Sequence, residues 1–178
     1  RLGVVKAMNG DVTVNAGRDI RIEDGASSLT AENATLKAGV TAAGGWADAG
    51  TVLIADGAAV TIGSKFLADA RDHVFVLDGA QVTAAGADDA LELRAENGSV
   101  EINADNTAVQ TLVKATAGNV KIDAGEGVEI GKRATVQAEE KLAVTADQLG
   151  DGAIGAGVTV RDADTLVTAK NVELTALE

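Results

Sequence analysis

Short alternations of apolar and polar residues recur along this chain. Residues 9–26 read NGDVTVNAGRDIRIEDGA, in which Val12-x-Val14 and Ile20-x-Ile22 are separated by Ala16-Gly17. Period two places the apolar residues on one face and the polar residues on the other, as in half-buried strands. The same alternation occurs at Val52-x-Ile54, Val60-x-Ile62, Val74-x-Val76, Leu91-x-Leu93, Val100-x-Ile102, Leu142-x-Val144, Val158-x-Val160 and Val172-x-Leu174. The pattern predicts many short strands joined by turns of the Ala-Gly, Asp-Gly and Asn-Gly type.

The opening passage is repeated later in the chain. Residues 117–134, AGNVKIDAGEGVEIGKRA, match residues 9–26 at an offset of 108, and NGSVEINAD at 97–105 matches its first half at an offset of 88. Both offsets are close to whole multiples of about 20–22 residues, which indicates a solenoid with units of that length. In this register Glu101 would lie beside Lys121 of the next coil. The starts of the alternations imply about eight coils, and with strands about 4.8 Å apart these would form a rod of roughly 40 Å.

Two other folds are compatible with parts of the pattern. A meander of hairpins also uses short strands, but it needs no long repeat, whereas stacked parallel coils select like residues one turn apart. Residues 136–149, VQAEEKLAVTADQL, contain good helix formers, so a helix is an alternative there. Leu142-x-Val144 keeps the repeat register, which favours a strand over a helix there. We therefore predict that residues 1–178 form a single repeat segment with an all-β parallel β-helix fold. Its register breaks near 39–50 and 148–157.

Composition limits which residues can fill the core and which classes of partner the chain can bind. The chain is 46% hydrophobic but only 2% aromatic, with 21 Gly and neither Pro nor Cys. The core must therefore be filled by Val, Ile, Leu and Ala in a narrow space, and this apolar content is too high for a disordered chain. The net charge of −12 argues against nucleic acid and anionic membrane surfaces as partners. No apolar stretch is long enough to predict insertion into a membrane.

Carboxylate pairs are the first candidates for catalysis. Cleavage of a glycosidic bond needs two carboxylates at set separations, but neighbours in a strand point to opposite faces. The only histidine, His73, lacks the further ligands of a histidine-based metal site nearby in the sequence. We therefore predict that the chain is not an enzyme and holds no metal and no cofactor. The carboxylate pairs considered are Asp88-Asp89, Glu139-Glu140 and Asp162-x-Asp164.

Trp46 is the one candidate binding residue. It is the only Trp and lies in the segment 39–50, GVTAAGGWADAG, where the repeat pattern is interrupted. Insertions in solenoids project from one edge and often carry binding surfaces. The alternative is a plain turn in which Trp46 covers apolar surface.

The repeat itself resembles that of a known family. Strings of the form G-[DN]-V-x-[VI]-x-A-G-x-x-[IV]-x-[IV], as in Gly10–Ile22 and Gly118–Ile130, are similar to the haemagglutinin repeats of filamentous-haemagglutinin-like exoproteins. Gram-negative bacteria export these proteins by two-partner secretion, and contact-dependent-inhibition toxins carry similar repeats in their stalks. The resemblance implies a right-handed parallel β-helix that is secreted or displayed at the bacterial cell surface, with roles in adhesion, aggregation, biofilm and virulence.

The same resemblance implies partners. These are host-cell or bacterial surface receptors or glycans, reached through the larger protein, and the outer-membrane two-partner transporter during export. The family's amino-terminal secretion domain carries Asn-Pro motifs, which a sequence without Pro lacks, and no carboxy-terminal toxin is visible. The chain resembles an interior shaft segment, so no functional residue of the family is carried over.

Three hypotheses of function follow. We favour a structural shaft or adhesin segment whose stacked coils hold a distal tip away from the cell. The alternative is a glycan- or protein-binding module that uses a solenoid face or the 39–50 excursion, and a third is a polysaccharide-cleaving β-helix enzyme. Because coils at both ends of such an array are open, we also expect an isolated fragment to associate end to end.

Overall fold

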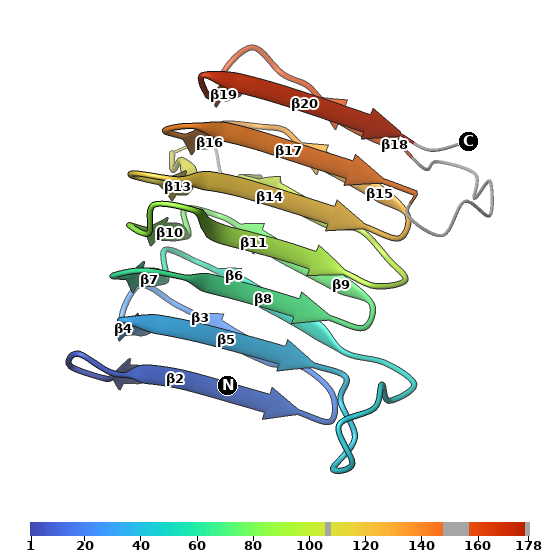
Figure 1. The fold of residues 1–178 in the computed structure, drawn as a ribbon. Coiled ribbons are helices and arrows are strands. Elements are labelled where there is room, and N and C mark those ends of the chain that lie inside the picture. The colour runs from blue at the N-terminus through green and yellow to red at the C-terminus, as the bar shows by residue number, and fades with distance from the viewer. Residues whose placement is uncertain (106–107, 148–156, 177–178) are drawn as a thin grey trace.

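The computed structural model describes residues 1–105, 108–147 and 157–176. All regular secondary structure in that part of the chain is β-strand, arranged in three sheets through which the chain passes in turn (Figure 1). Every pair of neighbouring strands in these sheets is parallel, for example β2 with β5 and β6 with β9. The predicted parallel β-helix is therefore confirmed, and the meander of hairpins is excluded. The helix considered over 136–149 is wrong, because two strands cover most of it.

Each sheet takes one strand from each coil. Sheet I contains β1 (Val4–Lys6), β4 (Ser28–Ala31), β7 (Ala59–Ile62), β10 (Gln81–Ala84), β13 (Thr111–Ala115), β16 (Ala134–Ala138) and β19 (Leu166–Thr168). Sheet II contains β2 (Asp11–Ala16), β5 (Asn33–Ala38), β8 (Phe66–Ala70), β11 (Asp89–Ala95), β14 (Asn119–Ala124), β17 (Lys141–Ala146) and β20 (Asn171–Ala176). Sheet III contains β3 (Ile20–Glu23), β6 (Thr51–Ala55), β9 (His73–Leu77), β12 (Val100–Asn103), β15 (Gly127–Ile130) and β18 (Gly157–Val160).

The coils are fewer and longer than the sequence repeat predicted. The described strands form six coils of three strands and a seventh that contributes β19 and β20, instead of eight coils. Residues that bond across neighbouring coils have a sequence separation of 22 for Asp11 and Asn33, but of 32 for Asn33 and Lys65. Where the sequence separation between stacked strands is large, the coil contains extra residues at a corner, such as 39–50. The predicted repeat length is therefore too short, because insertions at the corners lengthen a coil without changing its inward pattern.

The two sequence offsets have different meanings in the structure. The offset of 108 connects Val12 to Val120 through four successive steps of sheet II. The offset of 88 connects Val12 in sheet II to Val100 in sheet III, so the third copy is not in the same stack. The expected pair of Glu101 and Lys121 is consequently wrong: Glu101 lies opposite Phe75 and Glu129.

The core is a stack of small and branched residues that runs along the axis. One inward column of sheet II passes from Ala34 through Phe66 and Leu91 to Val120, all of them buried. Every strand of sheet II ends in Ala, because the chain bends there and only a small side chain fits inside the corner. Aliphatic residues fill this narrow interior, so Phe66 is the only aromatic among the buried core residues of the described chain.

The inward columns become accessible to solvent at the first and last described coils. In the first coil Val12 is only half-buried, whereas its stacked partner Ala34 is fully buried. In the last coil the inward residues Val172 and Leu174 are 49% and 50% exposed.

The two predicted register breaks have different outcomes. The break at 39–50 forms a short excursion between β5 and β6, which projects beside the lower coils in Figure 1. The second predicted break, 148–157, lies outside the described residues except for Gly157.

Candidate functional site

A hollow lies along the corner at which the chain passes from sheet III to sheet I. It has a volume of about 720 Å³ and is lined by Asp56, Gly57, Asp78, Gly79, Gln81, Asp105, Val109 and Gln110. Its acidic residues follow strands of sheet III in successive coils, so the fold gathers carboxylates that are far apart in the sequence. A stack of carboxylates suggests cation binding, and the contacts of the individual side chains test that idea.

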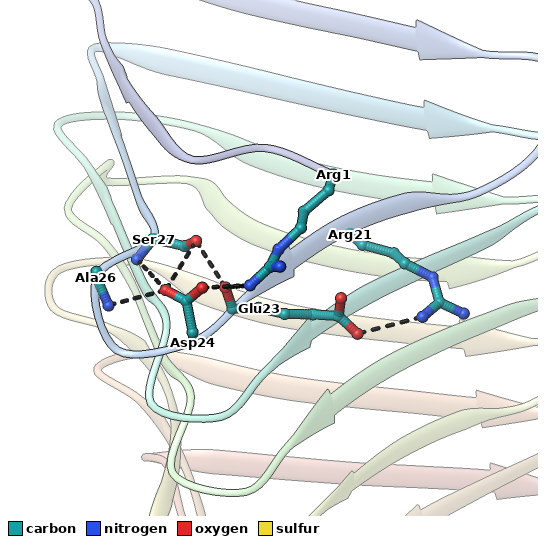
Figure 2. A network of polar contacts seen from close by, with 6 residues as sticks. All are labelled: Arg1, Arg21, Glu23, Asp24, Ala26 and Ser27. Atoms are coloured by element: carbon teal, nitrogen blue, oxygen red, sulfur yellow. Dashed lines mark hydrogen bonds and ion pairs between the residues drawn. The ribbon is translucent and has the colours of Figure 1, made fainter.

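Asp24 shows what an aspartate does at this corner (Figure 2). Its backbone has a positive φ of 80°, a conformation that Asp tolerates because its short side chain bonds to the local backbone. The Asp24 carboxylate accepts hydrogen bonds from the N–H groups of Ala26 and Ser27, both at 3.0 Å, and Arg1 donates to the same carboxylate. Desolvation opposes ionisation of Asp24, but these hydrogen bonds and Arg1 outweigh it and lower its pKa.

Other corner aspartates bond to a neighbouring coil. Asp78 accepts from the N–H of Asp105 at 3.0 Å, and Asp162 accepts from the N–H of Lys132 at 3.1 Å. Both aspartates have positive φ, as Asp24 has. The described residues contain no group of three or more His, Cys, Asp or Glu side chains that could hold a metal ion. Asp24 thus stabilises its own turn, whereas Asp78 and Asp162 join neighbouring coils.

The outer face of sheet III differs from this corner because it combines aromatic and ionisable side chains. Its central column, read along the axis, consists of Leu53, Phe75, Glu101, Glu129 and Thr159 in register. A parallel column contains Leu77 beside Asn103. The face thus changes from apolar side chains on β6 and β9 to carboxylate and amide side chains on β12 and β15.

His73 and Phe75 form a stacked ring pair on β9. Their centroids lie 5.3 Å apart with an interplanar angle of 10°, and both side chains are half-buried. His73 Nδ1 accepts a hydrogen bond from the N–H of Ser99 at 3.1 Å, so the proton of the neutral ring is on Nε2. The ring pair is consequently held in a fixed orientation by the following coil.

The carboxylates of Glu101 and Glu129 lie on neighbouring strands next to this ring pair. Burial raises the pKa of Glu101, and the adjacent Glu129 raises it further. Asn103 donates a hydrogen bond to Glu101, while Arg161 donates to Glu129 from Nε at 3.1 Å and from Nη2 at 2.5 Å. These contacts hold both carboxylates in place on the outer face.

A shallow hollow of about 190 Å³ opens beside the two carboxylates. It is lined by Ser99, Val100, Glu101, Gly127, Val128, Glu129, Gly157 and Thr159. Gly127 and Gly157 are stacked in register and leave this part of the face without side chains.

Trp46, the residue chosen from the sequence, lies at a different corner. It forms an antiparallel bridge with Val40 in the excursion between β5 and β6, and its side chain is half-buried. The turn of this excursion is fixed by Thr41, whose Oγ1 bonds to the N–H and carbonyl of Gly45 at 3.1 Å. The role of Trp46 in binding stays a prediction.

The carboxylate pairs considered for catalysis have structural partners. Asp89 accepts from the Asn119 side chain at 3.1 Å, and Lys170 contacts Glu139 at 3.6 Å and Glu140 at 2.6 Å. Asp164 lies 3.9 Å from Arg133. Asp88-Asp89 and Glu139-Glu140 lie at the corner between sheets I and II, two coils apart, whereas Asp162-x-Asp164 lies at the corner between sheets III and I. No contact in the described chain brings the pairs together.

The sequence did contain a signal for Glu101 and Glu129. The tripeptide Val-Glu-Ile occurs at 100–102 and again at 128–130, and these two copies are stacked partners in sheet III. Their separation in the sequence is longer than the predicted repeat of about 20–22 residues, so that repeat does not pair them.

The outer face of sheet II carries an ion-pair ladder. Lys37 lies 3.5 Å from Asp69, and Lys121 pairs with Asp123 and lies 3.6 Å from Glu92. Asp69 is only 4% exposed, one of its oxygens has no hydrogen-bond partner among the described residues, and burial raises its pKa. These pairs join successive coils and give the face alternating charges.

Comparisons with known proteins identify no relative: no family model, no curated protein and no solved structure matches the chain. No helix in the described part of the chain could cross a membrane.

Proposed function

We propose that this chain is a structural shaft segment of a large secreted or surface-displayed bacterial exoprotein that supports adhesion, aggregation or biofilm formation. In this proposal the chain is a spacer and catalyses no reaction. The observation that supports it most is the continuity of the stacked core, whose inward columns pass through all the described coils. Six steps of about 4.8 Å give a rod of roughly 30 Å.

The outer faces suit such a role. Ion pairs such as Lys37–Asp69 connect neighbouring coils along sheet II, and Thr30, Thr61 and Thr83 follow one another on the outside of sheet I. A polar exterior with a net charge of −12 keeps a long rod soluble and opposes sideways association. The repeat pattern, which is similar to haemagglutinin repeats, supports export by two-partner secretion.

Export and display test this proposal directly. The chain is fused behind a two-partner secretion domain, expressed with the matching outer-membrane transporter, and detected by an antibody against a carboxy-terminal tag on intact cells. We expect the tag at the surface or in the medium, in a protease-resistant form. Val120→Asp, which places a charge in the core, is the control and should be exported but degraded. Retention of the wild-type chain inside the cell, under conditions that export a known haemagglutinin repeat, would contradict the proposal.

A second candidate function, binding of a glycan or a protein, is favoured by one observation. Phe75 and His73 form a half-buried ring pair on the outside of the solenoid, where the coil needs no aromatic residue.

A further inference from the structure

We propose that the outer face of sheet III, from β6 to β18, binds a carbohydrate chain with neutral or amino sugar units. This inference rests on the second candidate function and narrows it to one class of ligand; it goes beyond the shaft function, because a spacer needs no ligand on its side. The site consists of an apolar half, with Leu53, Phe75 and the His73 ring, and a polar half, with Glu101, Asn103, Glu129 and Arg161.

The apolar half is not required by the fold. Phe66 is in the core, whereas Phe75, the only other Phe of the chain, points outward with Leu53 beside it and Leu77 on the same face of its strand. The equivalent outward column of sheet I consists of threonines in three neighbouring coils. An aromatic ring that is rigidly held and half-exposed offers a flat apolar surface, which suits the C–H face of a sugar ring.

The polar half offers planar hydrogen-bonding groups on adjacent strands. Glu101 and Glu129 supply carboxylates and Arg161 a guanidinium, which bonds to Glu129. The buried Asn103 amide donates to Glu101 and fixes its orientation. Carboxylates and guanidinium groups bind with two parallel hydrogen bonds, the arrangement that vicinal hydroxyl groups of a sugar require. The two stacked glycines leave a hollow beside them that a hydroxyl-bearing ring could enter.

The order of side chains along the solenoid axis favours a carbohydrate over a protein as the ligand. The strands lie about 4.8 Å apart, so Phe75 and Glu101 on neighbouring strands can contact the same or adjacent sugar units. A stable protein interface buries about 800 Å² on each partner, and three apolar side chains that are themselves partly buried are too few for its core. Two carboxylates with one guanidinium leave the polar half negative, which disfavours uronic acids and sulfated sugars.

The test uses the full chain in a binding screen against immobilised neutral, amino-bearing and uronic-acid-containing oligosaccharides, followed by titration of each soluble oligosaccharide that binds. We expect binding to neutral or amino sugars, and at least a tenfold loss of affinity in Phe75→Thr. Leu67→Thr is the matched control, because Leu67 occupies the outward position of β8 in the same coil but on sheet II. It should bind as the wild type does. Circular dichroism and thermal melts confirm that both variants are folded.

Three results would overturn the proposal. The first is failure of the folded wild-type chain to bind any neutral or amino sugar. The second is equal affinity in Phe75→Thr and the wild type, and the third is preferential binding of uronic acids. Glu101→Gln adds an independent readout, since it keeps the shape of the side chain but should weaken binding as well. Export and display of Phe75→Thr should be normal, so failure of this proposal is distinguishable from failure of the shaft function.

Discussion

Replacing Gly125 by Ala should destabilise the chain strongly, although the equivalent change at Gly17 should not. Both glycines follow the Ala that ends a strand of sheet II, and they align in the repeat at an offset of 108. A Cβ added at Gly125 would overlap the carbonyl oxygen of Glu96 and lie 2.9 Å from backbone atoms of Asn97. A Cβ added at Gly17 would meet only the carbonyl oxygen of Val40, at 3.8 Å.

The difference has a definite expected size. Overpacking costs about 1–3 kcal/mol, and the atoms that the new methyl group would meet at Gly125 are backbone atoms that cannot rotate away. We therefore expect a loss near the upper end, about 2–3 kcal/mol, which in a chain of this length lowers the Tm by about 4–12 °C. Gly17→Ala should stay within about 0.5 kcal/mol of the wild type, as an exposed substitution with free space does.

Urea-induced unfolding followed by far-UV circular dichroism measures both variants under the same conditions. The comparison is internal, because both changes add one methyl group to a glycine at the same repeat position. If the free energies of unfolding of Gly125→Ala and Gly17→Ala differ by less than about 0.5 kcal/mol, the corners of successive coils are not in the close contact described, and the stacking of that corner is refuted.

Three further predictions concern the core, a buried charge and the ends. Val120→Asp should cost about 4 kcal/mol or more, because it buries an unpaired carboxylate, whereas Val172→Asp in the same column should cost much less because Val172 is 49% exposed; urea unfolding compares them. Burial raises the pKa of Asp69 in the folded chain above its ordinary 3.8. At pH values between these two pKa values the folded chain binds more protons than the unfolded chain. The free energy of unfolding therefore falls as the pH rises through this window. Asp69→Asn should remove this fall, as urea titrations across that pH window will show, and an unchanged pH dependence would contradict it. The accessible inward residues at Val12 and Leu174 should cause concentration-dependent, end-to-end association in sedimentation velocity experiments, which Leu174→Lys should weaken; a monomer at all concentrations would contradict this.

The strands could be predicted from the sequence because alternation is a local property. All eight alternations beyond residue 26 coincide with strands of the structure, and the inward residues of those in the middle coils, such as Val74 and Ile102, are buried. The number of coils could not be predicted in the same way. Excursions such as 39–50 change the spacing between coils but leave the inward pattern of each strand intact, so the repeat length was underestimated.

The candidate site was missed for a related reason. Glu101 and Glu129 become neighbours only when β12 and β15 stack, and their separation along the chain includes three corners of different length. Trp46 was chosen because it is the only Trp and lies where the repeat pattern is interrupted. Phe75 lies within a regular alternation, so the sequence pattern gives no sign that it belongs to a site. The register between coils determines which outward side chains share a face. That register depends on the lengths of the turns at the corners.

Short strands with an apolar inner face, and small residues at the bends between them, follow from the sequence alone. That information is local, since side chains alternate along a strand whatever its partners are. The choice of stacking partners is a property of the folded coils, because the hydrogen-bonding partner of each strand lies a whole coil away and the coils differ in length. The same stacking brings backbone atoms of Asn97 close to Gly125 and leaves space beside Gly17, and it places a ring pair and two carboxylates on one outer face.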